Sequence, residues 1–189
     1  MTIESRAESL IDLPLTGGPV TIDGALELER TAGGLLPHRL PASARAQFPD
    51  DDMLRAVESQ PSGVRLAFRT AATLIELQVL PTKLQFEGAP LRPAVPFDLR
   101  VDGTLTAQAS VEGGNVLQLS FGTRRGQVTP GRPGTARFAG LPARMKEVEI
   151  WLPHQETVEL IALRADAPAE PAASPGRPRW LHHGSSISH

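Results

Sequence analysis

The last eleven residues hold most of the side chains whose types and spacing could do chemistry. A strand-like run over residues 179–181 leads into Gly184-Ser185-Ser186, with His182 and His183 just before it and His189 at the end. Three histidines without an acidic partner make a weak metal site, so we assign no metal here. Gly and Ser alone would suggest a flexible tail, but the strand-like run favours the start of a folded element.

Three other residues of the chain carry groups that functional sites use. His38 and His154 each follow a Leu-Pro pair, which is typical of polar residues on surface loops, so we predict no function for them. Trp151 lies on the opposite side of a predicted strand from its apolar neighbours and is expected to point outward. There it forms an interface with another domain or a platform for a sugar, and we favour the interface.

The charged clusters do not indicate a ligand. Asp50-Asp51-Asp52 lacks the spacing of an EF-hand calcium loop and is better explained as the cap of a helix. Arg124-Arg125 and the alternating Arg65 and Arg69 indicate solvated faces, because without a net basic surface they do not favour phosphate binding.

Composition excludes several classes of protein. The 189 residues carry a formal net charge of -2, which argues against nucleic acid as a partner. No apolar run reaches the roughly 18 residues that span a membrane. There is no cysteine for disulfides or thiol catalysis. The polar N-terminus does not resemble a secretory signal, so we expect a cytoplasmic protein, and nothing in the sequence implies a cofactor.

Apolar residues alternate with polar ones from residue 20 to residue 164, which indicates strands with one buried face. Asp102-Gly103, between two such runs, predicts a tight hairpin turn, and a looser turn is expected at 112–115. The sequence therefore predicts an all-β fold, a two-sheet β-sandwich of jelly-roll type. The inward-facing sets are Val64/Leu66/Phe68, Ile75/Leu77/Val79, Phe97/Leu99/Val101, Leu105/Ala107/Ala109, Val148/Ile150/Leu152 and Val158/Leu160/Ala162.

One helix is predicted at 51–59, capped by Asp50, with Met53, Leu54 and Val57 as its apolar stripe. The chain divides into an N-terminal tail (1–18), the sandwich (19–165), a Pro/Ala-rich linker (166–178) and the start of a second domain (179–189). The linker composition is not expected to pack as a strand or a helix. The last segment ends inside what we predict to be the first turn of that second domain.

The run Trp180-Leu181-His182-His183-Gly184-Ser185-Ser186-Ile187-Ser188-His189 resembles the nucleophile block of GDSL-type esterases, the SGNH hydrolase superfamily. It is similar to the branch that carries Gly-Ser-Ser-Ile followed by Thr or Ser. The upstream region resembles the N-terminal sandwich domain of that branch. The matching pieces are Arg39-Leu40-Pro41, Ser62-Gly63-Val64-Arg65-Leu66 and Ile150-Trp151-Leu152-Pro153-His154.

The resemblance implies that Ser186 is the nucleophile and that Gly184 permits the sharp turn before it. The backbone N–H of Ser186 would also join the oxyanion hole at a helix start. Ser185 departs from the aspartate common at its position. The family's base, a histidine in an Asp-x-x-His pair, and its further glycine and asparagine oxyanion donors are not found in these residues. His182, His183 and His189 lie too near Ser186 in sequence to replace that base.

The resemblance therefore implies the N-terminal part of a serine esterase, with an acyl-enzyme on Ser186. Its substrates would be small-molecule or glycan esters, sugar O-acetyl esters among them, and its partner would be a C-terminal hydrolase domain in cis. We expect no nucleic acid and no membrane partner, and no activity from the chain alone. The alternatives are a non-catalytic module that binds carbohydrate or protein, and a purely structural domain. A glycan module would display two or three exposed coplanar aromatic rings.

Overall fold

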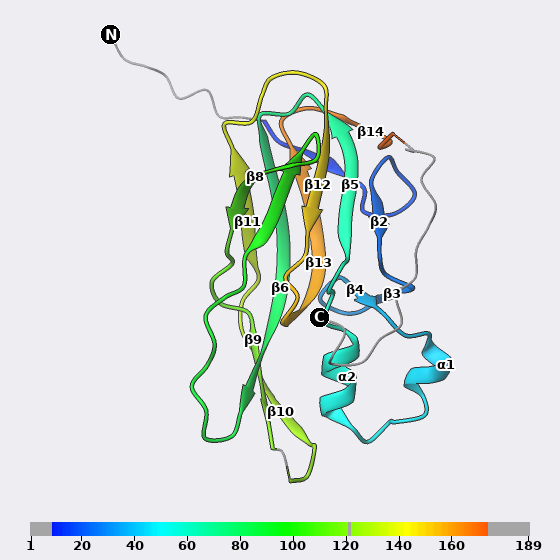
Figure 1. Cartoon of the computed structure of the whole chain (residues 1–189), viewed down its shortest axis with the longest axis vertical. Helices are drawn as coiled ribbons and strands as arrows, with labels where there is room; N and C mark the ends of the chain where they lie inside the picture. The colour runs from blue at the N-terminus through cyan, green and yellow to red at the C-terminus, as the bar shows by residue number, and fades with distance from the viewer. Residues whose placement is uncertain (1–8, 121, 174–189) are drawn as a thin grey trace.

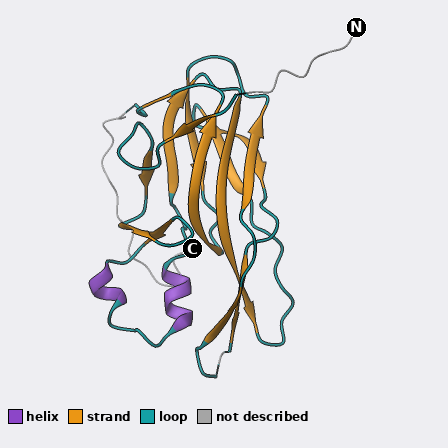
Figure 2. Ribbon diagram, turned by 180° about the vertical axis from the view of Figure 1, so that it is seen from behind, coloured by secondary structure: helices purple, strands orange, loops and turns teal. Residues whose placement is uncertain are grey.

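Because apolar and polar residues alternate along the strands, each sheet has one apolar face. The fold buries the two apolar faces against each other. The computed structural model describes residues 9–120 and 122–173. They form an eight-stranded and a six-stranded sheet that face each other, with two short helices at one end of the molecule (Figures 1 and 2). The predicted all-β two-sheet sandwich is confirmed.

The eight-stranded sheet is centred on two long strands, β6 (Leu74–Phe86) and β13 (Glu156–Ala165). Its order is β10-β9-β6-β13-β4-β3, with β1 also beside β13 and β11 beside β6. β9 runs parallel to β6, whereas β11 and β13 run antiparallel to it. The other strands are β1 (Ile11–Leu13), β3 (Glu27–Arg30), β4 (Leu35–His38), β9 (Asn115–Leu119), β10 (Gly126–Thr129) and β11 (Gly134–Ala139).

The six-stranded sheet has the order β14-β5-β12-β7-β8, with β2 also beside β5. Its strands are β2 (Thr21–Asp23), β5 (Arg65–Thr70), β7 (Phe97–Val101), β8 (Thr104–Ala109), β12 (Lys146–Trp151) and β14 (Ala169–Glu170).

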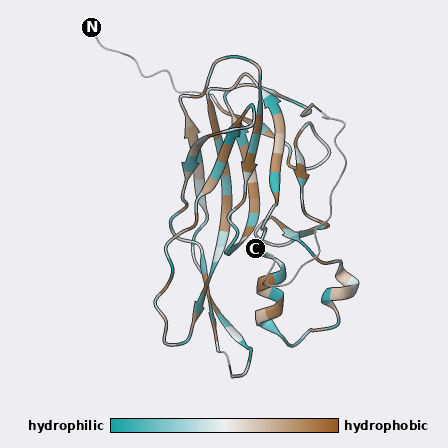
Figure 3. Cartoon of the chain, in the orientation of Figure 1, coloured by the Kyte–Doolittle hydropathy of each residue, from teal (hydrophilic) through white to brown (hydrophobic). Residues whose placement is uncertain are grey.

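Apolar side chains from both sheets form one continuous core. Hydrophobic and hydrophilic residues alternate along its strands (Figure 3). Three phenylalanines, Phe68, Phe97 and Phe138, are the largest apolar side chains in it, and each is at most 2% exposed. Four of the predicted inward sets are confirmed as buried, namely Val64/Leu66/Phe68, Ile75/Leu77/Val79, Phe97/Leu99/Val101 and Val148/Ile150/Leu152.

Two sets depart from the prediction because of irregular strand register. The Asp102-Gly103 turn has the two positive φ angles that we expected, 48° and 81°. A shift in the β7–β8 register then places Leu105 opposite the outward-facing Arg100, and Leu105 is 55% exposed. A shift between Leu160 and Ala162 in β13 likewise turns Leu163, rather than Ala162, into the core.

The helical region differs from the prediction in its cap and in its buried face. α2 spans Asp52–Glu58, and its cap is Asp51, whose side chain accepts a hydrogen bond from Leu54 N at 2.9 Å. Leu54 is 41% exposed, because α2 turns Ala56 and Glu58 toward the sandwich instead. A short α1 (Ala42–Arg45) precedes it and was not anticipated. Neither helix has the length and apolar character of a membrane-crossing segment.

The domain ends also differ from the predicted boundaries. β1, inside the predicted tail, pairs with β13 and buries Leu13. β14, inside the predicted linker, pairs with β5. Between β13 and β14, Asp166 holds the chain against the start of β6. Its carboxylate accepts hydrogen bonds from Thr73 N at 2.8 Å and from Leu74 N at 3.1 Å. Proline and alanine did not prevent this packing, because β14 pairs with β5 and the Thr70 hydroxyl donates to the carbonyl oxygen of Pro168 at 2.9 Å.

Asp166→Asn is expected to lower the free energy of unfolding at pH 7 by about 1.5–3 kcal/mol, since hydrogen bonds to a charged acceptor are lost. Burial alone would raise the pKa of Asp166, but the hydrogen bonds from Thr73 and Leu74 outweigh it and lower the pKa. The carboxylate therefore stabilises the fold above the unfolded-state value of 3.8, and this contribution disappears as the pH falls through the lowered native value.

Urea unfolding at pH 7 and near pH 3 measures the effect, with Asp12→Asn on β1 as the exposed control. A destabilisation by Asp166→Asn that is equally large at both pH values would contradict this account.

Candidate functional site

The residues that the sequence marks for chemistry, Gly184 and Ser186, lie outside the described residues, and so do His182, His183 and His189. Their predicted roles are therefore not tested by the structure. The part of the chain that it does describe offers two polar constellations, a network around His38 and a cavity that contains Lys83.

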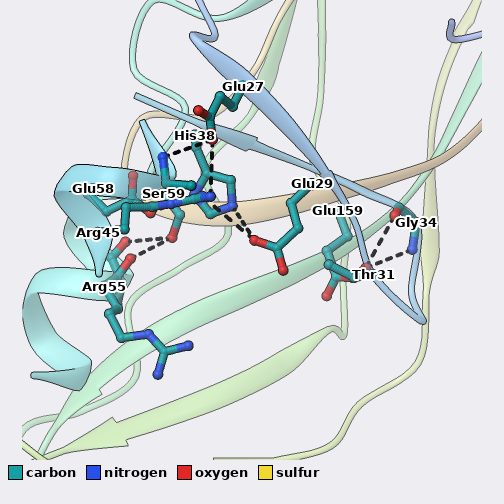
Figure 4. A network of polar contacts seen from close by, with 12 residues as sticks. Glu27, Glu29, Thr31, Gly34, His38, Arg45, Arg55, Glu58, Ser59 and Glu159 are labelled. Atoms are coloured by element: carbon teal, nitrogen blue, oxygen red, sulfur yellow. Dashed lines mark hydrogen bonds and ion pairs between the residues drawn. The ribbon is translucent and has the colours of Figure 1, made fainter. Parts of the chain in front are cut away.

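His38 is buried between two carboxylates at the end of the sandwich that carries the helices (Figure 4). Its Nδ1 lies 2.6 Å from Oε1 of Glu58 on α2, and its Nε2 lies 2.9 Å from Oε2 of Glu29 on β3. The residue is only 5% exposed. The prediction of a surface loop histidine is thus wrong for His38, because it ends β4 and is covered by α2. His154 is exposed, as predicted.

The neighbours of His38 extend the network but do not supply a nucleophile. Arg45 Nη2 pairs with Glu27 at 3.2 Å, and its Nη1 lies 3.7 Å from Glu29. The hydroxyl of Ser59 donates to carbonyl groups of α2, those of Arg55 at 2.8 Å and Ala56 at 3.2 Å. His38 and Glu58 line neither of the two cavities described below. The arrangement fastens both helices to the β3–β4 hairpin, which is a structural function.

The outer face of the six-stranded sheet carries Trp151 within a ladder of ion pairs. The guanidinium of Arg65 lies 4.9 Å from the centre of the Trp151 ring, and the indole N–H donates to Glu149 at 3.1 Å. Arg65 also pairs with Asp23 at 3.4 Å, and Arg69 pairs with Glu147 at 3.1 Å. These arginines form the solvated faces that we predicted, and Trp151 points outward as expected.

Within residues 9–120 and 122–173, none of the large exposed apolar side chains is aromatic. This part of the chain therefore does not present the set of exposed rings that a glycan module would use.

The Asp50-Asp51-Asp52 run fastens α2 to the β9–β10 hairpin. Asp51 caps the helix and pairs with Arg124 at 2.6 Å. Asp52 accepts a hydrogen bond from Gly126 N at 2.9 Å, and Asp50 pairs with Arg125 at 2.7 Å. Among the residues that the structure describes, no three histidine, aspartate or glutamate side chains come together in a way that could hold a metal ion.

A cavity of about 210 Å³ is lined by a buried lysine and a buried glutamate that were not predicted from the sequence. Lys83 on β6 is 7% exposed and Glu156 on β13 is 4% exposed, and the two residues face each other in the strand register. A signal was present in the sequence, because the alternation through Ile75, Leu77 and Val79 places Lys83 at an inward position. The other lining residues are Val57, Gln60, Leu84, Phe86, Arg92, Pro93, Val95 and Gln155.

The electrostatics of this cavity are set by burial. Burial raises the pKa of Glu156, opposed by a hydrogen bond from Val95 N and by the charge of Lys83. Val95 N donates to Oε1 of Glu156 at 3.0 Å. A second hollow, of about 880 Å³ along β1, β3, β4 and β13, is more open and has no buried charged side chain in its lining.

Comparison with known proteins places the sandwich in a family. Residues 20–161 match the family model described as the SsfX3 N-terminal domain. The chain belongs to this family. No curated protein matches it.

Two solved structures are similar to this SsfX3 N-terminal domain. One is the salicylyl-acyltransferase SsfX3 from a tetracycline biosynthetic pathway, with 26% identity and a TM-score of 0.69 over 90% of this chain and 43% of that chain. The other is a protein from Bacteroides ovatus ATCC 8483 described as a GDSL-like lipase, with 16% identity and a TM-score of 0.47 over 84% of this chain and 44% of that chain. This chain thus spans less than half the length of either protein. The sandwich is thus similar to part of the salicylyl-acyltransferase structure, and the nucleophile block of residues 180–189 stays a prediction.

His38→Ala is expected to lower the free energy of unfolding by about 3 kcal/mol, because it leaves the Glu58 carboxylate buried without its partner. Oε2 of Glu58 already has no hydrogen-bond partner among the described residues. Chemical denaturation measures the change, with His154→Ala as the exposed control. A double variant, His38→Leu with Glu58→Leu, should recover part of the loss. Equal small effects of His38→Ala and His154→Ala would show that the network does not stabilise the domain.

The free energy of unfolding of Glu156→Gln should rise relative to that of the wild type as the pH increases. A carboxyl group whose native pKa is raised stabilises the fold fully below its unfolded value of 4.5, and this contribution is lost as the pH rises through the native value. Gln cannot ionise, so the variant avoids that loss. Unfolding free energies from pH 4 to about pH 8 measure the difference, with the exposed Glu87→Gln as control. A difference that is independent of pH would contradict the raised pKa.

Proposed function

We propose that this chain is the N-terminal sandwich of an ester-processing enzyme of the SGNH type, in which Ser186 is the residue that becomes acylated. The likeness to the salicylyl-acyltransferase supports the proposal most directly, since it covers 90% of this chain at 26% identity. The resemblance of residues 180–189 to a nucleophile block supports it from the other end of the chain. The family match ends at residue 161 and so does not include residues 180–189.

The proposed chemistry is acyl transfer through a covalent intermediate. The Ser186 hydroxyl attacks the carbonyl carbon of an ester, while a base in the catalytic domain takes the hydroxyl proton and passes it to the departing alcohol. The Ser186 N–H stabilises the oxyanion, and Gly184 permits the turn that exposes the hydroxyl. Water as the second acceptor gives hydrolysis, and an alcohol gives transfer of the acyl group.

Carboxylic esters are the proposed substrate class, with sugar O-acetyl esters among them. In this proposal the sandwich packs in cis against the catalytic domain, with the Trp151 face of the six-stranded sheet as the side in contact. The cytoplasmic location expected from the sequence belongs to the same proposal.

The 189-residue chain alone should show no turnover of an activated acetyl ester above a Ser186→Ala control, because it lacks the Asp-x-x-His base. The longer parent protein should react covalently with a fluorophosphonate probe at Ser186, and mass spectrometry of the labelled peptide locates the adduct. Ser186→Ala should abolish the label. Ser185→Ala is the matched control and should keep it, because the resembling family varies at that position.

Two results would overturn the proposal. One is labelling of the parent protein that survives Ser186→Ala but not Ser185→Ala. The other is Ser186-dependent turnover by the isolated chain, which would mean that the base lies within these 189 residues.

A further inference from the structure

The cavity beside the C-terminal end of α2 is lined by Lys83, a lysine residue that is largely buried. Lys83 is 7% exposed. In the part of the chain that the structure describes, its Nζ makes neither a hydrogen bond nor an ion pair. Taking an ammonium group out of water is costly unless an anion or several acceptors compensate. Lys146, the other lysine, shows the usual solution, since its Nζ donates to the carbonyl oxygens of Ala72 at 2.5 Å and Pro142 at 2.9 Å.

Glu156 is opposite Lys83 in the strand register, and the charge of Lys83 acts on it without a direct ion pair. The two side chains line the same cavity without forming an ion pair. One carboxyl oxygen of Glu156 is occupied by Val95 N at 3.0 Å. Burial raises the pKa of Glu156, against the opposing effects of the Val95 hydrogen bond and of the Lys83 charge.

The remaining walls are mainly apolar, from Val57, Leu84, Phe86, Pro93 and Val95. Arg92 lies exposed at the rim, where it donates to Gln155 at 3.3 Å. A volume of about 210 Å³ is below the range of about 300–1,000 Å³ that is typical of drug-sized ligands. These features describe a ligand with one anionic end and a small apolar body.

We propose that this cavity binds a small organic carboxylate, with its anionic end on Lys83 Nζ and its apolar part against Val57 and Val95. Arg92 at the rim adds positive charge at the entrance and favours entry of an anion. Every residue of this site lies in the described part of the chain, so the inference does not depend on the role of Ser186.

Isothermal titration calorimetry of the purified 189-residue chain with benzoate, hexanoate and benzamide tests the proposal. Benzamide has the shape of benzoate without its charge. Either carboxylate should bind saturably, and benzoate should bind about tenfold or more tightly than benzamide. Lys83→Met keeps the apolar stem and should weaken benzoate binding by about tenfold or more. Lys83→Arg should retain part of the affinity, and Arg132→Met, a surface control outside the cavity, should bind as the wild type does.

Circular dichroism establishes that each variant is folded. Absence of saturable binding by both carboxylates would overturn the proposal, as would unchanged benzoate affinity in folded Lys83→Met. Titration of the longer parent protein distinguishes the source of the carboxylate. Binding to the 189-residue chain that is lost in the parent would mean that the parent's own acidic side chain fills the cavity, which also overturns a small-molecule site.

Discussion

The antiparallel pairing of β6 with β13 is the interaction on which the rest of the structure depends. It joins residues 75–83 to residues 156–165 at the centre of the larger sheet. One end of the pair places Lys83 opposite Glu156 in the cavity. The other end leads directly to Asp166, which ties the chain back to the start of β6. β1 and β4 are both added to β13, so β4, and with it His38, is held in place by the same pair.

Most of the buried ionisable side chains of the sandwich lie at the end that carries the helices. The core between the sheets is apolar, and the outer face of the six-stranded sheet balances its arginines with carboxylates. At the helical end, by contrast, His38, Glu58, Lys83 and Glu156 are all buried. Burial of so many ionisable groups costs stability unless partners or ligands compensate for it. His38 and Glu58 compensate each other through a hydrogen bond, whereas Lys83 lacks such a partner in the described structure.

Local pattern was sufficient to predict the sandwich, because alternation and the Asp102-Gly103 turn depend only on neighbouring residues. Local pattern failed where the placement of a residue depends on tertiary contacts. Leu105 was misplaced because a register shift in β7–β8 is not visible in the sequence. The face of α2 was misassigned because a buried His38–Glu58 hydrogen bond competes with the burial of Leu54. The cavity could not be foreseen, since it needs the register that brings Lys83 and Glu156 together from distant segments. The resemblance of short motifs to those of a sandwich domain, in contrast, led to a related family.

The central claim is that Ser186 belongs to a catalytic domain for which this sandwich is the N-terminal partner. The coding sequence downstream of the His189 codon tests it most directly. The account predicts an open reading frame of about 200 further residues, the size of one more domain, with an Asp-x-x-His pair near its end. A stop codon directly after His189 would leave Ser186 without a base. That result would contradict the claim and favour a binding module instead.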